Sequence, residues 1–428
     1  MFIKAQKPMA TSISIVVMAV FGLLGCGAGS NNPSSSLPNN VNSSSSAVTE
    51  ALSIAPNDVR IRYTGRVSLS ADEAVYDWPN TQIEFRTNAP LVELKLEDGN
   101  NDYNIFIDNQ LSQVLSTKNG VQRYALNLPV GDHHVLLTKR TGSNFGVGRF
   151  LGFNLPNGGQ LLELPAPPIH KIEFIGDSYT VGYGNEGPGL DCAGNLRPYE
   201  NSFLSYAPIS ARVLGAQSHS IAVSGKGAVR NYGDINTTSP DPVPTFYNRT
   251  LATRSDLLWN FTTWVPDAVV IKLGTNDHST DPIPSSETFI QGIHDLIRQV
   301  NNAYGQLPLF LLADSSSNLV IERLQRATQE QVNMGNIQVH FVQVEHPPQS
   351  QLGCDWHPKV EAHEAMAAQL VKAIKPILSW PDENSGSTNL KFAAATAPPF
   401  VGMSASSEGN NSIHKSAVDR FGYATTSF

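Results

Sequence analysis

The chain has 428 residues, of which 40% are hydrophobic and 15% are charged, so it is long enough for more than one folded domain with an apolar core. The formal net charge is −8, and no long basic run occurs, which gives a nucleic-acid-binding function little support.

The N-terminus has the pattern of an export signal. Lys4 and Lys7 precede an apolar run over residues 9–24 that ends in "LLGC". This run is marginal for a spanning helix, and its position predicts a signal peptide over 1–25. The "LLGC" stretch resembles a bacterial lipoprotein processing site, which would make Cys26 the acylated residue and place the protein at the outer membrane or cell surface. The alternative is a soluble secreted protein.

Residues 26–50 follow the predicted signal and consist mostly of small and polar residues, including "NSSSS". Such a composition cannot bury a core. The segment is predicted to be a flexible linker that holds the folded part away from the membrane.

The segment 55–165 alternates apolar and polar residues with a period of two. Runs of this kind include "QIEFRT", "LVELKLED", "YNIFIDN", "VQRYALNL" and "HHVLLTKR". Asp108-Asn109 and Asn119-Gly120 provide turn signals between such runs. No convincing helical pattern appears, so an all-β sandwich domain, jelly-roll-like, is predicted. Whether it binds sugar or only walls one side of a cleft stays open.

The pattern changes over 169–381, where short apolar runs such as "KIEFIG", "DAVVIKLG" and "PLFLLAD" alternate with helical patterns. One such helix carries apolar residues on a single face: Phe289, Ile290, Ile293, Ile297 and Val300. This alternation predicts an α/β domain with a parallel sheet covered on both faces. Residues 382–428 lose the pattern and are expected to form a poorly structured tail.

Three cysteines occur in the chain. With Cys26 acylated, Cys192 and Cys354 remain, and an exported pair is expected to form a disulfide. That bond would clamp together two loops far apart in sequence. Two free, unconnected thiols are the alternative.

Three loop residues carry groups suited to acyl transfer. Ser178 in "GDS", Gly225 in "VSGKG" and Asn276 in "LGTND" each follow a predicted strand, at the edge where parallel sheets bind ligands. A serine needs a base to become a nucleophile, and the intermediate needs hydrogen-bond donors for its oxyanion. The backbone N–H groups of Ser178 and Gly225 and the side-chain amide of Asn276 could supply these donors. Taken singly, each could be an ordinary turn residue.

The predicted base is His357, which precedes Pro358 and opens the last helical pattern in "CDWHPKVEAH". A histidine there can present its ring at the sheet edge. The rival histidines are weaker: His278 could line the pocket, His346 lies in "EHPP", and His363 falls within the helix. The order Ser, Gly, Asn, His, each at a loop entry, favours catalysis over a structural role.

These four blocks resemble the SGNH, or GDSL, hydrolase superfamily over about residues 172–378. The resemblance implies a flavodoxin-like three-layer fold, with Ser178 as nucleophile and His357 as general base. The superfamily usually places an aspartate three residues before this histidine, where the chain has Cys354. Asp355 could still orient the imidazole as the third triad member. Alternatively a backbone carbonyl holds the ring, leaving a Ser-His dyad.

A narrower resemblance joins the sandwich, "GDSYTVGYGNEG", "TFYNRTL" and "GCDWHP" to carbohydrate esterase family 2. It implies removal of acetyl groups from plant polysaccharides such as acetylated xylan or glucomannan, also at the 6-O position. Trp356, beside the base, is the stacking candidate for a sugar face, and a buried helix anchor is its alternative role. The aromatic residues of the long insertion before Asn276 are expected to be at least half core.

Two other functions remain open. A lipase-like or thioesterase GDSL enzyme would need an apolar channel, whereas these loops are polar. A non-catalytic carbohydrate-binding lipoprotein would have no need of all four blocks. Neither a metal nor another cofactor is expected, because no close His or Cys pairs have zinc spacing, and His133-His134 would face opposite ways in a strand.

Overall fold

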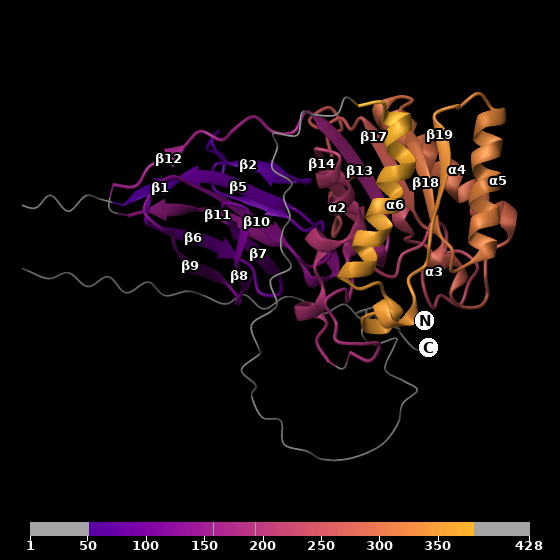
Figure 1. Cartoon of the computed structure of the whole chain (residues 1–428), viewed down its shortest axis with the longest axis horizontal. Coiled ribbons are helices and arrows are strands. Elements are labelled where there is room, and N and C mark those ends of the chain that lie inside the picture. The colour runs from indigo at the N-terminus through magenta and orange to yellow at the C-terminus, as the bar shows by residue number, and fades with distance from the viewer. Residues whose placement is uncertain (1–50, 157, 193, 381–428) are drawn as a thin grey trace, which may run out of the picture. The chain divides into compact units, whose positions relative to one another are not determined.

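The computed structural model describes residues 51–156, 158–192 and 194–380, which form a β-sandwich followed by an α/β domain (Figure 1). This architecture confirms the predicted fold class. The predicted signal peptide, linker, acylated Cys26 and C-terminal tail lie outside the described residues. No helix within the described ranges is long and apolar enough to cross a membrane.

Two antiparallel sheets make the sandwich. The first has the order β3 (Ser68–Leu69), β4 (Ala74–Tyr76), β11 (Gly148–Leu155), β6 (Leu91–Glu97) and β9 (Val121–Asn127), with β1 (Leu52–Ile54) paired to β11. The second has the order β12 (Leu161–Leu162), β5 (Gln82–Thr87), β10 (His133–Lys139), β7 (Asp102–Ile107) and β8 (Gln110–Ser116), with β2 (Arg62–Thr64) paired to β5.

Because apolar and polar residues alternate along the strands, every second side chain points into the core between the two sheets. Along β6, Val92, Leu94 and Leu96 are fully buried, and their neighbours are more exposed. The predicted turn Asp108-Asn109 joins β7 and β8 with both residues at positive φ, as a tight hairpin requires. Asn119-Gly120 instead connects β8 to β9, which lies in the other sheet.

The α/β domain is built on a parallel sheet with the order β14 (Ala216–Ala222), β13 (His170–Gly176), β17 (Ala268–Lys272), β18 (Leu309–Asp314) and β19 (Val339–Val344). Its helices are α1 (Ser178–Val181), α2 (Tyr206–Val213), α3 (Thr275–His278), α4 (Ser286–Tyr304), α5 (Asn318–Asn333) and α6 (Val360–Leu378). A small hairpin of β15 (Arg249–Leu251) and β16 (Arg254–Leu258) lies in the long insertion. Short 3₁₀ helices complete the loops: Ser143–Phe145, Arg197–Tyr199, Ser202–Leu204, Val243–Thr245, Gln349–Gln351 and Cys354–Trp356.

Each face of the parallel sheet buries a separate apolar core. Ile175 and Ile271 point toward α4 and α5, where they meet Phe289. Phe174 and Val270, on the opposite face, pack with residues of α2 and α6. Burying an apolar side chain of this size contributes roughly 1.5–3 kcal/mol, so the near-continuous apolar strands follow from having helices on both sides.

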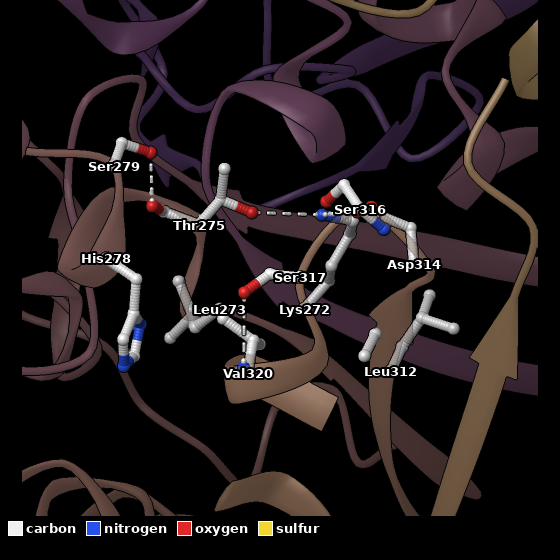
Figure 2. A pocket seen from close by; sticks show the side chains of 11 residues that line it. Lys272, Leu273, Thr275, His278, Ser279, Leu312, Asp314, Ser316, Ser317 and Val320 are labelled. Carbon is white, nitrogen blue, oxygen red and sulfur yellow. Dashed lines mark hydrogen bonds and ion pairs between the residues drawn. The ribbon is translucent and has the colours of Figure 1, made fainter. Parts of the chain in front are cut away.

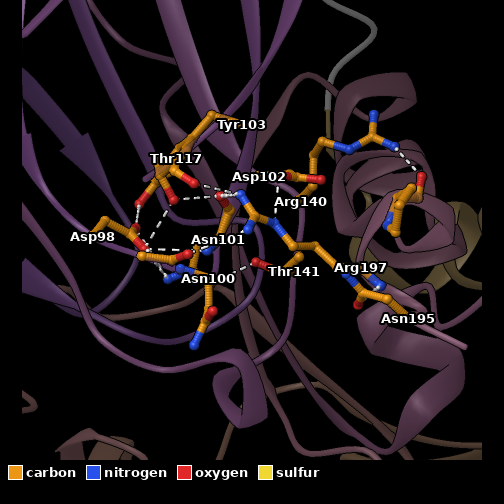
Figure 3. A network of polar contacts seen from close by, with 12 residues as sticks. Asp98, Asn100, Asn101, Asp102, Tyr103, Thr117, Arg140, Thr141, Asn195 and Arg197 are labelled. Atoms are coloured by element: carbon orange, nitrogen blue, oxygen red, sulfur yellow. Dashed lines mark hydrogen bonds and ion pairs between the residues drawn. The ribbon is translucent and has the colours of Figure 1, made fainter. Parts of the chain in front are cut away.

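Buried polar contacts join the sandwich to the α/β domain. Arg66 of the sandwich and Glu173 of β13 are both fully buried and form an ion pair at 3.1 Å. Figure 3 shows a second junction, where Arg197 donates from Nε to Asp102 at 2.6 Å and from Nη2 to the carbonyl of Asn101 at 2.7 Å. The sandwich is therefore packed against the α/β domain and is not tethered by the connector alone.

Candidate active site

The turn after β13 places Ser178 at the carboxyl edge of the sheet. Gly176 is required there, because an added Cβ would come within 2.0 Å of Thr180 Oγ1. Asp177 then caps α1 by accepting a hydrogen bond from the backbone N–H of Tyr179 at 3.1 Å. Ser178 is the first helical residue and is 6% exposed. Its side chain is thus fixed at the end of a buried strand.

The imidazole of His357 lies beside the hydroxyl of Ser178. Its Nε2 is 2.7 Å from Ser178 Oγ, and its Nδ1 lies 2.9 Å from the carbonyl oxygen of Asp355 and 3.2 Å from that of Cys354. Since a carbonyl oxygen can only accept, Nδ1 carries the proton and Nε2 is left to accept from the serine. Burial lowers the pKa of His357 to about 4, so the ring is neutral near pH 7.

Asp355 contacts the base through its main chain. Its backbone is left-handed, with φ 50° and ψ 42°, and this turns its carbonyl toward His357. The carboxylate accepts a hydrogen bond from the hydroxyl of Tyr183 at 2.7 Å. Of the two arrangements that the sequence left open, the structure therefore has the backbone carbonyl on Nδ1. A catalytic role for the Asp355 carboxylate stays a prediction.

The predicted disulfide between Cys192 and Cys354 is confirmed, with Cα atoms 5.2 Å apart. It holds the 3₁₀ helix Cys354–Trp356 against the loop that follows α1. The backbone N–H of Cys354 also donates to the carbonyl of Gly184 at 3.3 Å, and that of Asp355 donates to Leu190 at 2.9 Å. The loop that carries the base is therefore fixed to the segment that begins at the nucleophile.

The predicted oxyanion donors Ser178, Gly225 and Asn276 follow three adjacent strands of the sheet, β13, β14 and β17. Gly225 follows β14 with φ +79°, a conformation that favours glycine. Within the described part of the chain, the backbone N–H groups of Ser178 and Gly225 have no acceptor. The side-chain Nδ2 of Asn276 donates one hydrogen bond to the carbonyl of Lys226 at 2.8 Å. Its second amide hydrogen can therefore be donated to an oxyanion.

Asp277 is a residue of the site that the sequence analysis missed. Its buried carboxylate accepts hydrogen bonds from the backbone N–H groups of Ala228, Val229 and Arg230, at 2.8–2.9 Å. Those groups belong to the loop that carries Gly225, so Asp277 ties one oxyanion donor to the helix of Asn276. Its place directly after Asn276 in "GTND" was the available signal. Burial raises the pKa of this carboxyl.

Two exposed aromatic residues adjoin residues of the site. Trp356 is 60% exposed with φ +66°, so its alternative role as a buried helix anchor is wrong. Tyr232 is 45% exposed, and its backbone N–H donates to the carbonyl of Gly225 at 2.9 Å. The insertion also contains core aromatics, as expected: Tyr247 is fully buried, and Phe246 and Trp259 are partly buried.

The rival histidines have structural partners. His278 Nδ1 lies 2.7 Å from the carbonyl of Gly274, and His346 Nδ1 lies 3.3 Å from a carboxylate oxygen of Asp314. His363 is buried in α6, where its Nδ1 accepts from the backbone of Tyr206 at 3.2 Å. Across residues 51–156, 158–192 and 194–380, no group of three or more His, Cys, Asp or Glu side chains could hold a metal ion.

A buried charge cluster lies behind the nucleophile. Lys272 Nζ pairs with Asp314 Oδ2 at 3.1 Å and lies 3.7 Å from the centre of the Tyr179 ring. Asp177 is fully buried, and burial raises the pKa of its carboxyl to about 6. Lys272 opposes this rise and is the main positive charge acting on Asp177. The cluster thus keeps the ammonium of Lys272 close to the helix that begins with Ser178.

Comparison with known proteins gives two family matches. Residues 63–165 match the family described as Carbohydrate esterase 2 N-terminal, and residues 174–365 match the GDSL-like Lipase/Acylhydrolase family. The two matches cover the sandwich and most of the α/β domain respectively.

Two curated relatives are similar over most of this chain. An acetylxylan esterase / glucomannan deacetylase of Cellvibrio japonicus is 31% identical over 314 residues, which cover 69% of this chain and 84% of that protein. The cellulase/esterase CelE of Acetivibrio thermocellus is 34% identical over 334 residues. That match covers 75% of this chain but only 40% of CelE, so the chain spans less than half of that relative.

Among solved structures, a family two carbohydrate esterase from Clostridium thermocellum in complex with cellohexaose has a TM-score of 0.70 and 31% identity. The match covers 75% of this chain and 100% of that structure. A family two carbohydrate esterase from Cellvibrio japonicus gives the same TM-score at 24% identity, and so supports the fold.

Proposed function

The chain belongs to carbohydrate esterase family 2, and we propose that it removes O-acetyl groups from plant polysaccharides through an acetyl-enzyme formed on Ser178. The observation that carries this proposal is the 2.7 Å contact between Ser178 Oγ and His357 Nε2, with Nδ1 anchored on backbone carbonyls. A nucleophile in contact with a neutral, oriented base is the arrangement that ester hydrolysis needs.

In the first half of the reaction, Ser178 attacks the acetyl carbonyl while His357 takes the hydroxyl proton. The tetrahedral intermediate carries its negative charge toward the N–H groups of Ser178 and Gly225 and the amide of Asn276. Loss of one such donor costs about 10²–10³ in kcat in well-studied hydrolases. Protonated His357 then gives its proton to the departing sugar oxygen. The acetyl group stays bound to Ser178 as the acetyl-enzyme.

In the second half, His357 accepts a proton from water, which attacks the acetyl carbon. The imidazolium then returns this proton to Ser178 Oγ as the bond between Oγ and the acetyl carbon breaks and acetate is released. The imidazolium formed in each half is stabilised by the carbonyl oxygens of Cys354 and Asp355, which accept from Nδ1. A carbonyl dipole replaces the aspartate of a triad in this role. The Ser-His dyad is therefore the proposed catalytic unit.

We further propose acetylated xylan and acetylated glucomannan as the substrate class, with acetyl groups at the 6-O position included. Sugars present apolar ring faces with hydroxyls at their edges, and exposed aromatic rings bind such faces. Trp356, which precedes His357, and Tyr232, which is bonded to the loop of Gly225, are exposed and would supply these surfaces. The names of the Cellvibrio japonicus relatives include both deacetylase activities.

Export as a lipoprotein acylated on Cys26 remains part of the proposal. It rests on the sequence pattern of the N-terminus and suits an enzyme whose polymeric substrates lie outside the cell. Labelling with a radioactive fatty acid, compared between the full chain and Cys26→Ala, would test it. Equal labelling of both proteins would overturn it.

Acetate release tests the activity itself. The chain without its first 50 residues would be incubated with acetylated xylan, acetylated glucomannan and a long-chain ester, with Ser178→Ala as control. Ser178-dependent acetate from either polysaccharide is the expected result. Turnover of the long-chain ester alone would favour a lipase-like enzyme, and binding without turnover would favour a carbohydrate-binding protein.

A further inference from the structure

A separate cavity lies next to the catalytic centre, at the carboxyl ends of β17 and β18. Figure 2 shows it, and its volume is about 290 Å³. The buried Lys272 and Asp314 form its floor. Thr275 of α3 and Ser279, the residue after that helix, line one wall, and Ser316 lies on the opposite wall. Ser279 and Ser316 are exposed, so the cavity opens to solvent between them. Neither Ser178 nor His357 lines it.

Three ionisable groups line this cavity, Lys272, Asp314 and His278, and burial lowers the pKa of His278, which favours its neutral form. The ammonium of Lys272 and the carboxylate of Asp314 neutralise each other at 3.1 Å. Above them are the hydroxyl groups of Thr275, Ser316 and Ser317, which can each donate or accept a hydrogen bond. An anion would meet the carboxylate and a cation the ammonium, so the lining suits a neutral ligand that carries several hydroxyl groups.

The cavity and the catalytic centre are connected through neighbouring residues. Thr275 lines the cavity, and the next residue, Asn276, turns its amide toward the oxyanion loop. Lys272 on the floor is 3.7 Å from the centre of the Tyr179 ring, and the ring centre of His357 is 5.7 Å from that of Tyr179.

We propose that this cavity is a subsite for a neutral sugar unit of the polysaccharide, close to the unit whose acetyl group is removed. Its volume lies at the lower end of small-molecule sites, which suits one sugar ring. Apolar carbons of Leu273, Leu312 and Val320 beside the hydroxyl groups match the mixed surface of a sugar. This inference rests on the proposed function, and it names the part of the polymer that the enzyme recognises beyond the ester.

The test fills the cavity from each wall. Ser316→Leu and Ser279→Leu add bulk at the opening without touching Ser178, His357 or the oxyanion donors. Asn318→Leu is the matched control, since this exposed residue is near Ser316 in sequence and does not line the cavity. Acetate release is measured on an acetylated oligosaccharide and on an acetylated methyl glycoside, which is a single sugar unit. Each enzyme is compared with wild type.

The filled variants should raise KM for the oligosaccharide roughly five- to tenfold, with kcat near wild type and the methyl glycoside unaffected. Asn318→Leu should match wild type on both substrates. An unchanged oligosaccharide KM in both filled variants would overturn the subsite, and so would equal losses on both substrates.

A binding measurement separates failure of the subsite from failure of the proposed function. Wild type and Ser316→Leu are titrated calorimetrically with xylohexaose, mannohexaose and cellohexaose, none of which carries an ester. Wild type should bind at least one of them, and Ser316→Leu should bind it several-fold more weakly. No binding of any of the three by wild type would contradict the subsite, whatever the esterase assay shows. Absence of Ser178-dependent acetate release, with binding intact, would contradict the activity alone.

Discussion

The hydroxyl of Tyr183 donates a hydrogen bond to the carboxylate of Asp355 at 2.7 Å, while the carbonyl of Asp355 accepts from His357 at 2.9 Å. One residue thus has separate main-chain and side-chain partners at the site. Its left-handed backbone, with φ 50°, makes this division possible. The function of Asp355 therefore depends on its conformation more than on its charge.

Replacing Asp355 by Asn should reduce kcat less than about fivefold, because asparagine tolerates a left-handed backbone and keeps the carbonyl on Nδ1. In a true triad the same change costs about 10⁴. Asp355→Val should lose much more, since a β-branched residue resists positive φ. The check is kcat on a small acetyl ester. A loss of several orders of magnitude in Asp355→Asn would show that the carboxylate takes part in catalysis.

The pH dependence of kcat/KM should reflect the lowered pKa of His357. Because burial lowers it to about 4, activity should rise as the pH increases through about 4 and be level near neutrality. An unshifted histidine would centre the rise near 6.5. The contribution of His357 to folding stability has the matching sign: it is complete above about pH 6.5 and declines as the pH falls toward 4. Circular dichroism at each pH would separate unfolding from protonation.

Asp277→Asn should lower kcat roughly ten- to a hundredfold, because the loop of Gly225 loses a charged acceptor bound by three N–H groups. KM should change little, since the loop acts on the transition state. Asp256→Asn is the control. Asp256 is an exposed aspartate of β16 that pairs with Arg254. Kinetics of both variants, with thermal melts to verify folding, make the comparison. Equal kcat in the two variants would remove the positioning role.

Arg66→Met should cost about 3–5 kcal/mol of unfolding free energy, because it leaves the carboxylate of Glu173 buried without its cation. The double variant with Glu173→Leu should recover much of this loss, since replacing a whole buried pair by apolar residues is often neutral. Urea unfolding of both variants and of wild type gives the values. A double variant less stable than Arg66→Met would mean that the contacts of Glu173 with Tyr247 and Tyr304 dominate.

Periodicity in the sequence predicted the strands well, because burial of alternate or consecutive side chains leaves a local pattern. The segment "QIEFRT" coincides with β5, and "KIEFIG" lies within β13. The ion pair between Arg66 and Glu173 joins residues 107 positions apart and leaves no such pattern. The sequence likewise left open which group accepts from His357 Nδ1, since that depends on the backbone angles of Asp355.

The sequence showed Asp277 directly after Asn276 but did not show which groups its carboxylate anchors. Its acceptor bonds go to backbone N–H groups, which every residue except proline carries, so the partner loop has no distinctive side chains. The nucleophile, the base and the oxyanion loops were recognisable because each requires a particular residue type at a strand end.

The disulfide between Cys192 and Cys354 makes the position of the base depend on the redox environment, because the carbonyl of Cys354 is one of the two that accept from His357. Its cysteines are 162 positions apart, so the bond can close only after most of the catalytic domain has been made. Reducing compartments keep such thiols apart, whereas oxidising ones join them. The chain would therefore complete its catalytic centre late in biosynthesis, and only where an oxidant is present. Production in a reducing host should accordingly yield a folded but poorly active enzyme.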